Sequence, residues 1–513
     1  MSGSRWSEAR RAAAALALIA AGALPIAAVA QPRATSAANG ASDPETRYRL
    51  EREHWERIES PEERAACRRE AAAARAEARR GWPGAAPDDP IRYLENALRR
   101  CEPLPPEERA DCEYRVRGGG TMYAGGVNPH AGGVVMDLGG LDRIVEIDVA
   151  RGVVVVEPGV RFGTLANALA PYGLTIGIIP STAPTATIGG ATSAHALRPG
   201  SPRFQSFGDE VVGLEVVLAD GTVLRTGSAA ARDAGFFHRY GIGPDLTGLF
   251  LGADGTFGVI TQIALWLHPL PAVRGTGCFG FPDVAAAAAF VGELQQREYL
   301  ADVWYGSGYE AASIRARIGA ARPALDPATL PGFCIGLDFG GEPDDVARAE
   351  SRALDAARRH GGDTFPEFNE IYFDRLRGDQ IYWYSFAGYF ARSRCGILMA
   401  SLPTARMPAF IDVLAQCRAS APALTWGGAV VLCRRGLHGG VMAFYDEATQ
   451  WDDVNEARQA CASALVAAGC TPYKSGKTWA ADVRRMAPYH STLRRLKAAF
   501  DPAGILSPGN LGL

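Results

Sequence analysis

From residue 115 onward, short apolar runs alternate with glycine-rich turns, the pattern of strands in a protein that mixes helices and strands. A helix is predicted at Phe162–Ala170, and Ala219–Thr222 is predicted to be a hairpin turn in which Asp-Gly supplies the positive φ angles. Together these elements predict a first α+β region. Its predicted strands are Gly132–Leu138, Val153–Val156, Val211–Leu218, Thr222–Thr226 and Val259–Leu267.

From Gly275 onward the pattern changes, and longer helical segments alternate with the apolar runs. This alternation predicts a sheet covered on one face by helices. A last helix, Tyr489–Phe500, is followed by the turn Asp501–Gly504. The predicted helices are Val284–Glu298, Asp344–His360, Met407–Ala419 and Val454–Gly469, and the predicted strands are Cys334–Asp338, Gly396–Leu402 and Gly440–Tyr445.

The N-terminus has the pattern of an export signal. Arg5, Arg10 and Arg11 precede an uncharged, alanine-rich run, Ala12–Ala30, that ends in Ala-Val-Ala. The arginine pair also suggests the twin-arginine route. An uncleaved anchor is the alternative, but alanine is weakly apolar and Pro25 breaks the run, so cleavage is favoured. We therefore expect an exported protein, either periplasmic or secreted. If the N-terminal segment is not a functional signal, the protein would be cytoplasmic. No later apolar run is long enough to span a membrane.

A linker (residues 31–45) and a charged helical extension rich in Glu, Arg and Ala follow, up to residue 114. Cys101 and Cys112 flank a tight segment, and they either form a disulfide in an exported protein or stay free thiols. The cysteines and histidines show no metal-ligand spacing, so no metal is expected.

Composition narrows the class of protein. The chain has 513 residues, 47% of them hydrophobic, and a formal net charge of −3. These values exclude a wholly disordered chain and argue against a nucleic-acid binder. The 59 glycines and 33 prolines are more than usual. Many of the glycines gather in three loops of the first region.

These glycine loops are the candidate binding site for a phosphate-bearing cofactor. Arg117-Gly118-Gly119-Gly120-Thr121 begins a loop that continues to Gly125-Gly126. Adjacent glycines let backbone N–H groups approach an anion such as a pyrophosphate. The spacing differs from the Rossmann fingerprint. Pro180–Ala191, expected to be extended, and Gly252–Thr261 are the second and third loops.

The order of the motifs R-G-G-G-T, V-V-x-x-x-P-G-V, A-T-I-G-G, L-E-V-V-L-A-D-G-T-V and G-P-D-L-T-G-L-F-x-G-A-D-G-T-F-G-V-I-T resembles the FAD-binding domain of FAD-linked oxidases. This family is of the vanillyl-alcohol oxidase / p-cresol methylhydroxylase (PCMH) type and includes glycolate-oxidase-like 2-hydroxy-acid dehydrogenases. Residues 496–510 resemble its closing motif. The resemblance implies an α+β fold with a PCMH-type FAD-binding domain (115–271), a cap domain of antiparallel sheet covered by helices (272–488), a C-terminal segment (489–513) that returns to the FAD site, and the N-terminal helical extension.

The resemblance also implies which residues bind FAD. The loop Gly118–Gly126 contains no histidine, so FAD is expected to be non-covalent. The implied FAD-binding residues are Arg117, Gly118, Gly119, Gly120, Thr121, Gly125, Gly126, Thr182, Thr187, Gly189, Gly190, Ala194, His195, Gly258, Val259, Ile260 and Asn510.

One segment departs from the family. Its members carry a strand, a helix and a strand before R-G-G-G-T. Here Ile91–Cys101 could supply the helix and Tyr114–Val116 the last strand, but no first strand is evident. Either the FAD cradle is remodelled, or the charged extension has replaced this part.

On the substrate side, a cationic side chain can bind a substrate carboxylate, and a histidine can accept the proton of a substrate hydroxyl. The catalytic candidates are His438, Tyr445, Lys477 and Arg434; Arg435 and Lys474 are further cations of the cap domain, and for each residue a purely structural role is the alternative. We therefore expect an FAD-dependent oxidoreductase acting on a small hydroxylated molecule, a 2-hydroxy acid or an activated alcohol, by hydride transfer to flavin N5. Electrons would pass to oxygen, a quinone or a cytochrome. The alternative is a non-catalytic exported protein that keeps the fold with an impaired flavin site.

Overall fold

The computed structural model describes residues 115–121, 134–180, 182–183, 185–197, 200–240, 242–318, 330–367, 394–446, 449–474 and 479–513. The described residues belong to one compact unit. The predicted signal, the linker, the charged extension with Cys101 and Cys112, and the segment Ile91–Cys101 lie outside them. Within these ranges no helix is long and apolar enough to cross a membrane.

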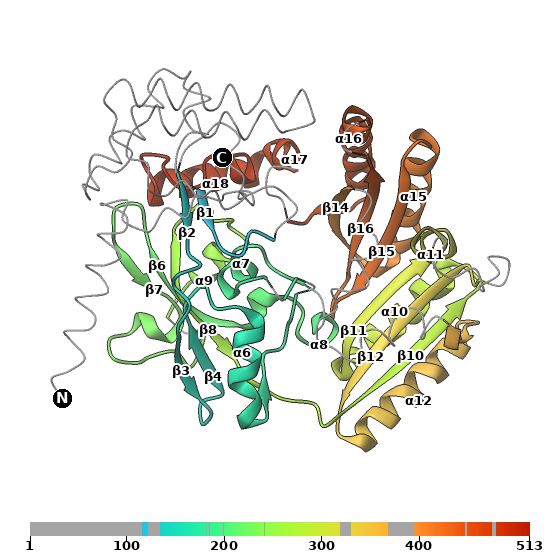
Figure 1. Cartoon of the computed structure of the whole chain (residues 1–513), viewed down its shortest axis with the longest axis horizontal. Helices are drawn as coiled ribbons and strands as arrows, with labels where there is room; N and C mark the ends of the chain where they lie inside the picture. The colour runs from blue at the N-terminus through green and yellow to red at the C-terminus, as the bar shows by residue number, and fades with distance from the viewer. Residues whose placement is uncertain are drawn as a thin grey trace, which may run out of the picture. The chain divides into compact units, whose positions relative to one another are not determined.

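The first region contains a five-stranded antiparallel sheet (Figure 1). β4 is a run of four valines buried on both faces of this sheet, because alternate side chains of a strand point to opposite faces. The predicted helix is α6, Phe162–Leu169. The strands, in sheet order, are β3 (Ile144–Asp148), β4 (Val153–Val156), β8 (Val259–Trp266), β6 (Val211–Val217) and β7 (Val223–Arg225).

The hairpin between β6 and β7 is confirmed, with one correction. Only Gly221 takes a positive φ, +82°, whereas Asp220 does not. The Asp220 carboxylate instead accepts a hydrogen bond from the backbone N–H of Thr222 at 2.9 Å. The aspartate therefore closes the turn with its side chain, and the glycine alone provides the left-handed backbone.

The second region contains an antiparallel sheet, as the resemblance implied, and this sheet has eight strands. On β12, Phe333, Ile335, Leu337 and Phe339 join the core under the helices, whereas Cys334 belongs to a separate cluster. The strands, in sheet order, are β13 (Asp363–Thr364), β10 (Val273–Phe281), β12 (Phe333–Gly341), β11 (Val303–Glu310), β15 (Thr425–Leu432), β16 (Leu437–Tyr445), β14 (Arg394–Leu402) and β17 (Thr471–Pro472). The helices are α10 (Val284–Gln296), α12 (Pro343–Arg359), α15 (Met407–Ser420) and α16 (Trp451–Ala467).

Three long strands of this sheet, β10, β11 and β15, were not predicted. Each contains glycines, which weaken the strand pattern in a sequence. In the fold these glycines make room for neighbours: a Cβ on Gly308 would lie 2.6 Å from side-chain atoms of Ile335 and Phe333. These segments therefore form strands because their glycines allow close packing, which the sequence pattern does not reveal.

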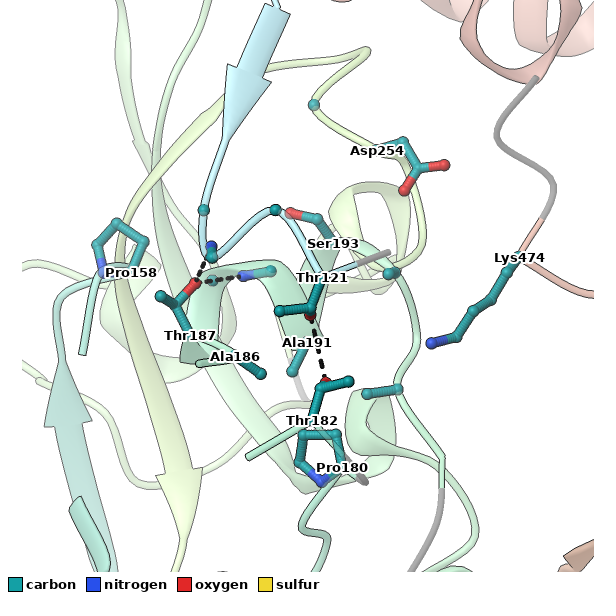
Figure 2. A pocket seen from close by; sticks show the side chains of 18 of the residues that line it. Thr121, Pro158, Pro180, Thr182, Ala186, Thr187, Ala191, Ser193, Asp254 and Lys474 are labelled. Carbon is teal, nitrogen blue, oxygen red and sulfur yellow. Dashed lines mark hydrogen bonds between the residues drawn. The ribbon is translucent and has the colours of Figure 1, made fainter. Parts of the chain in front are cut away.

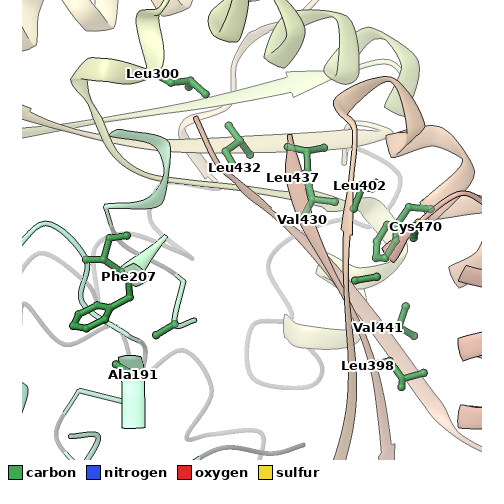
Figure 3. Packing of buried hydrophobic residues seen from close by; sticks show 14 of the residues in the cluster. Ala191, Phe207, Leu300, Leu398, Leu402, Val430, Leu432, Leu437, Val441 and Cys470 are labelled. Carbon is green, nitrogen blue, oxygen red and sulfur yellow. The ribbon is translucent and has the colours of Figure 1, made fainter. Parts of the chain in front are cut away.

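The main core runs from one region to the other. It includes Ala191 and Phe207 of the first region and Val430, Leu437 and Val441 of the large sheet (Figure 3). A disulfide between Cys417 and Cys461 joins α15 to α16. The two cysteines are 44 residues apart, and no motif in the sequence predicts that they pair.

The C-terminal segment is held by a buried ion pair at the end of α18 (Ala487–Phe500). Lys497 pairs with the fully buried carboxylate of Asp501, and its ammonium donates to the carbonyl of Thr256 at 2.8 Å. The same carboxylate accepts the backbone N–H groups of Ile505 and Leu506. The family's closing motif therefore fixes the chain end against the turn that precedes β8.

Replacing Lys497 with Met should destabilise the protein by roughly 3 kcal/mol, because it leaves the Asp501 carboxylate buried without its cation. Urea unfolding followed by tryptophan fluorescence measures this. Arg485→Met is the matched control: Arg485 pairs with Asp482 through an exposed side chain, so its loss should cost under about 1 kcal/mol. Equal losses in the two variants would contradict this role for the buried pair.

Candidate functional site

A cavity lies where the glycine loops of the first region meet the large sheet, and both sides line it (Figure 2). The first region contributes the loop after β1 (Arg115–Arg117), the helix α7 (Ile188–Ser193) and the residues that lead into β8. The large sheet contributes Met399, Val431 and His438, and Tyr473 and Lys474 follow β17.

The hydroxyl of Thr187 joins two of the glycine loops. Thr187 Oγ1 accepts the backbone N–H of Gly119 at 3.2 Å and that of Gly190 at 3.2 Å, so it caps α7 and holds the first loop at once (Figure 2). Thr182 Oγ1 donates to Thr121 Oγ1 at 3.3 Å. The end of the second loop is thus a short helix, and the expectation that Pro180–Ala191 is wholly extended is wrong because Thr187 starts a helix there.

The first loop fits a phosphate-bearing cofactor. A Cβ on Gly118 would lie 2.5 Å from Thr187 Oγ1, and one on Gly119 would lie 2.3 Å from the carbonyl oxygen of Thr185, so both positions need bare backbone. Arg117 Nε is buried and has no hydrogen-bond partner in the part of the chain that the structure describes. A buried guanidinium nitrogen without an acceptor is costly. A pyrophosphate of FAD beside this loop would supply the acceptor, and Gly118–Gly120, Thr121 and Arg117 would hold it.

Most of the predicted FAD-binding residues line the cavity. Gly125 and Gly126 lie outside the described residues, and the side chains of Arg117, His195, Val259 and Asn510 are not among those that line it. The predicted residues that do line it are Gly118, Gly119, Gly120, Thr121, Thr182, Thr187, Gly189, Gly190, Ala194, Gly258 and Ile260.

Asn510 and His195 act on the cavity wall from behind. Asn510 is fully buried, and its Nδ2 donates to the carbonyl of Asp254, a residue of the wall, at 3.1 Å. The ring of His195 packs between Gly208 and Gly252, and burial lowers its pKa. Both side chains therefore support the backbone of the site.

On the substrate side, His438 and Lys474 face the same cavity. His438 Nδ1 is hydrogen-bonded to Ser401 Oγ at 2.9 Å, and its ring lies 4.5 Å from that of Tyr473. Burial, and then the positive charge of Lys474, lower the pKa of His438 to about 3. The imidazole is therefore neutral at pH 7 and able to accept a proton.

The other catalytic candidates are not brought to the cavity. Tyr445 lies at the opposite end of β16 from His438, with its ring 6.2 Å from that of Trp451. Arg434 is a surface residue whose guanidinium pairs with Glu298 at 2.6 Å. Lys477 lies outside the described residues. Neither Arg434 nor Tyr445 is among the described residues that line the cavity, and a catalytic role for each stays a prediction.

The sequence did not single out several residues of this site. Pro158 belongs to the quoted P-G-V motif and Tyr473 precedes the candidate Lys474, so the sequence could have indicated both residues. Met399, Val431 and Ser401 had none, because only strand pairing places Ser401 and Val431 opposite His438.

Family models match two segments of the chain. Residues 108–227 match the "FAD binding domain", and residues 487–511 match the "FAD linked oxidases, C-terminal domain". The predicted resemblance and FAD as the cofactor are thereby confirmed. The second match contains the Lys497–Asp501 pair and Asn510.

Relatives and solved structures agree with these matches. The chain is 35% identical over 189 residues to glycolate oxidase subunit GlcD of Bacillus subtilis, a match that covers 36% of this chain and 38% of that protein. It is 35% identical over 180 residues to the mitochondrial D-lactate dehydrogenase [cytochrome] of Arabidopsis thaliana, covering 34% and 30%. The chain thus spans about a third of the length of these curated relatives.

Two solved structures share the fold. The 4-ethylphenol oxidase of Gulosibacter chungangensis superposes with a TM-score of 0.65 at 20% identity, covering 79% of this chain and 87% of that one. p-Cresol methylhydroxylase gives a TM-score of 0.64 at 18% identity, covering 82% and 87%. The predicted fold class is confirmed.

Replacing Gly119 with Ala should weaken FAD binding by roughly tenfold or more, because the new Cβ would meet the Thr185 carbonyl and displace the loop from Thr187. Titration of FAD into the purified protein, followed by flavin fluorescence, measures the affinity. Gly140→Ala is the control, since no atom lies within 4 Å of its Cβ position. Unchanged FAD affinity in Gly119→Ala would refute the role of this close approach.

Proposed function

Since the chain carries the FAD-binding domain and the closing segment of the FAD-linked oxidases, we propose that it is an FAD-dependent oxidoreductase that oxidises a 2-hydroxy acid or an activated alcohol. The observation that carries the proposal is the shared cavity. A neutral, half-buried histidine and a lysine face the space that the FAD-binding glycine loops line. A proton acceptor and a carboxylate-binding cation are what the oxidation of a hydroxy acid requires.

When held by Gly118–Gly120 and Thr121, FAD would supply the redox chemistry, namely an acceptor for the hydride of the hydroxyl-bearing carbon. His438 accepts the hydroxyl proton at Nε2, because Ser401 occupies Nδ1. Lys474 reaches toward the cavity (Figure 2) and binds the substrate carboxylate. Met399 and Val431 lie beside His438 and give the substrate an apolar wall.

The charge of Lys474 makes proton acceptance depend on the substrate. In the free site this charge, added to burial, keeps the pKa of His438 low. A carboxylate bound to Lys474 would offset the charge, and the pKa of His438 would rise. The histidine thus becomes a stronger base when an acid substrate is bound.

We also propose that FAD is bound non-covalently, that the electron acceptor is oxygen, a quinone or a cytochrome, and that the protein is exported after cleavage near residue 30. The alanine-rich N-terminal pattern supports export. Acid denaturation that releases all flavin tests the linkage. N-terminal sequencing of the mature protein tests the cleavage.

The proposed activity is tested with FAD-loaded protein, a panel of 2-hydroxy acids and alcohols, and an artificial electron acceptor. His438→Gln should lower kcat by roughly 10²–10⁴-fold with FAD still bound, because the proton acceptor is lost. His360→Gln is the matched control, since His360 hydrogen-bonds Glu293 and is not among the residues that line the cavity.

Purified protein that stays colourless after incubation with FAD, or FAD-loaded protein that turns over no member of the panel, would overturn the enzyme proposal. Either result would favour the alternative of a non-catalytic protein with the same fold.

The pH dependence follows from the lowered pKa of His438. Because kcat/KM reports the free enzyme, it should stay level from pH 8 down to pH 5, with no loss centred on the usual histidine pKa near 6.5. Lys474→Met removes the charge that lowers this pKa, so its acid limb should move to higher pH. Steady-state kinetics with an uncharged alcohol substrate compare the two proteins. A wild-type limb centred near pH 6.5 would contradict the burial of the base.

A further inference from the structure

Tyr473 touches both the FAD-binding region and the proposed base. It follows β17, and its backbone N–H donates to the carbonyl of Met399 at 3.1 Å. Its hydroxyl donates to the backbone carbonyl of His195, and its ring lies 4.5 Å from the ring of His438. One side chain therefore connects the turn after α7 in the first region with β16 of the large sheet.

The accepting carbonyl is rigidly placed. His195 has a left-handed backbone, with φ at +44°. A Cβ on Gly208 would lie 2.5 Å from Cε1 of the His195 ring, and a Cβ on Gly252 would lie 2.3 Å from its Cδ2, so the ring is packed closely against backbone on two sides. A residue locked in this way presents its carbonyl in one direction. The adjacent Ala194 lines the cavity.

The base is held from two directions. Ser401 on β14 bonds Nδ1 of His438, and Tyr473 packs against its ring. β17 pairs with β14 at Ala400 and Ser401, so the strand that carries Ser401 also fixes the residues just before Tyr473. His438 is enclosed between these two side chains, and the other titratable or charged groups that act on it are Lys474 and His195.

We infer that Tyr473 is a positioning residue that ties His438 to the Ala194–His195 turn of the FAD-binding region and keeps the imidazole sheltered from water. The hydroxyl-to-carbonyl bond sets the distance between the turn and the large sheet at this point. The kinetic consequence rests on the proposed function, whereas the structural consequence does not.

The test is Tyr473→Phe in the full chain, which keeps the ring and removes only the hydroxyl. NMR of protein labelled with ¹³C-histidine follows the titration of His438, identified by comparison with His438→Gln. Without the hydroxyl bond, water reaches the imidazole, and its pKa should rise from about 3 toward the ordinary value near 6.5. In FAD-loaded protein kcat should fall by roughly tenfold while KM changes less than about twofold.

Tyr299→Phe is the control. Tyr299 is partly buried in the large-sheet region, and Arg352 stacks on its ring away from the cavity. It should leave both the titration of His438 and kcat unchanged. Thermal unfolding of each variant verifies the fold, and the NMR titration is recorded with and without FAD, so weaker FAD binding does not affect the comparison.

The outcomes separate the two ideas. A His438 titration that moves in Tyr473→Phe supports the positioning role, even if no hydroxylated substrate is oxidised and the proposed function fails. A titration and a kcat that match the wild type overturn the positioning role and leave the proposed function intact. Equal shifts in Tyr473→Phe and Tyr299→Phe also overturn it, because the effect would then be general.

Discussion

The hydroxyl of Thr187 is the contact on which the cavity depends. It accepts two backbone N–H groups from loops that are far apart in the sequence, and it starts α7 at the same time. Two backbones can meet at one oxygen only if no side chain intervenes, which explains the bare glycines around it. Beside these glycines, a buried guanidinium nitrogen of Arg117 has no acceptor among the described residues, which suits a pyrophosphate.

The opposite wall follows from antiparallel pairing. β16 lies between β14 and β15, so His438 has Ser401 on one side and Val431 on the other. This arrangement leaves the imidazole half-buried, and its partial burial and the charge of Lys474 keep it neutral at physiological pH. A substrate carboxylate beside Lys474 would reverse part of that effect. In the proposed reaction, substrate binding and proton acceptance would therefore be coupled through charge.

The end of the chain supports this site from behind. Lys497 and Asp501 fix the last helix against the carbonyl of Thr256, and Asn510 donates to the carbonyl of Asp254. Both carbonyls belong to the third glycine loop. The C-terminal match to FAD-linked oxidases thus has a physical basis in stability. Asn510, predicted from the resemblance to lie near the flavin, acts through the backbone of the wall.

The sequence by itself determined the alternation of strands and helices, the glycine loops and the resemblance to FAD-linked oxidases. These depend on the local hydrophobic pattern and on short motifs that can be recognised in the sequence itself. It could not decide between His438 and Tyr445, which share strand β16, or recognise Arg434 as the partner of Glu298. Those outcomes depend on which end of a strand meets the other sheet and on pairs between distant segments. Likewise, strand register alone places Ser401 opposite His438 and brings Met399 to the cavity. Such contacts are made by packing in three dimensions, and residue type and spacing do not encode them one at a time.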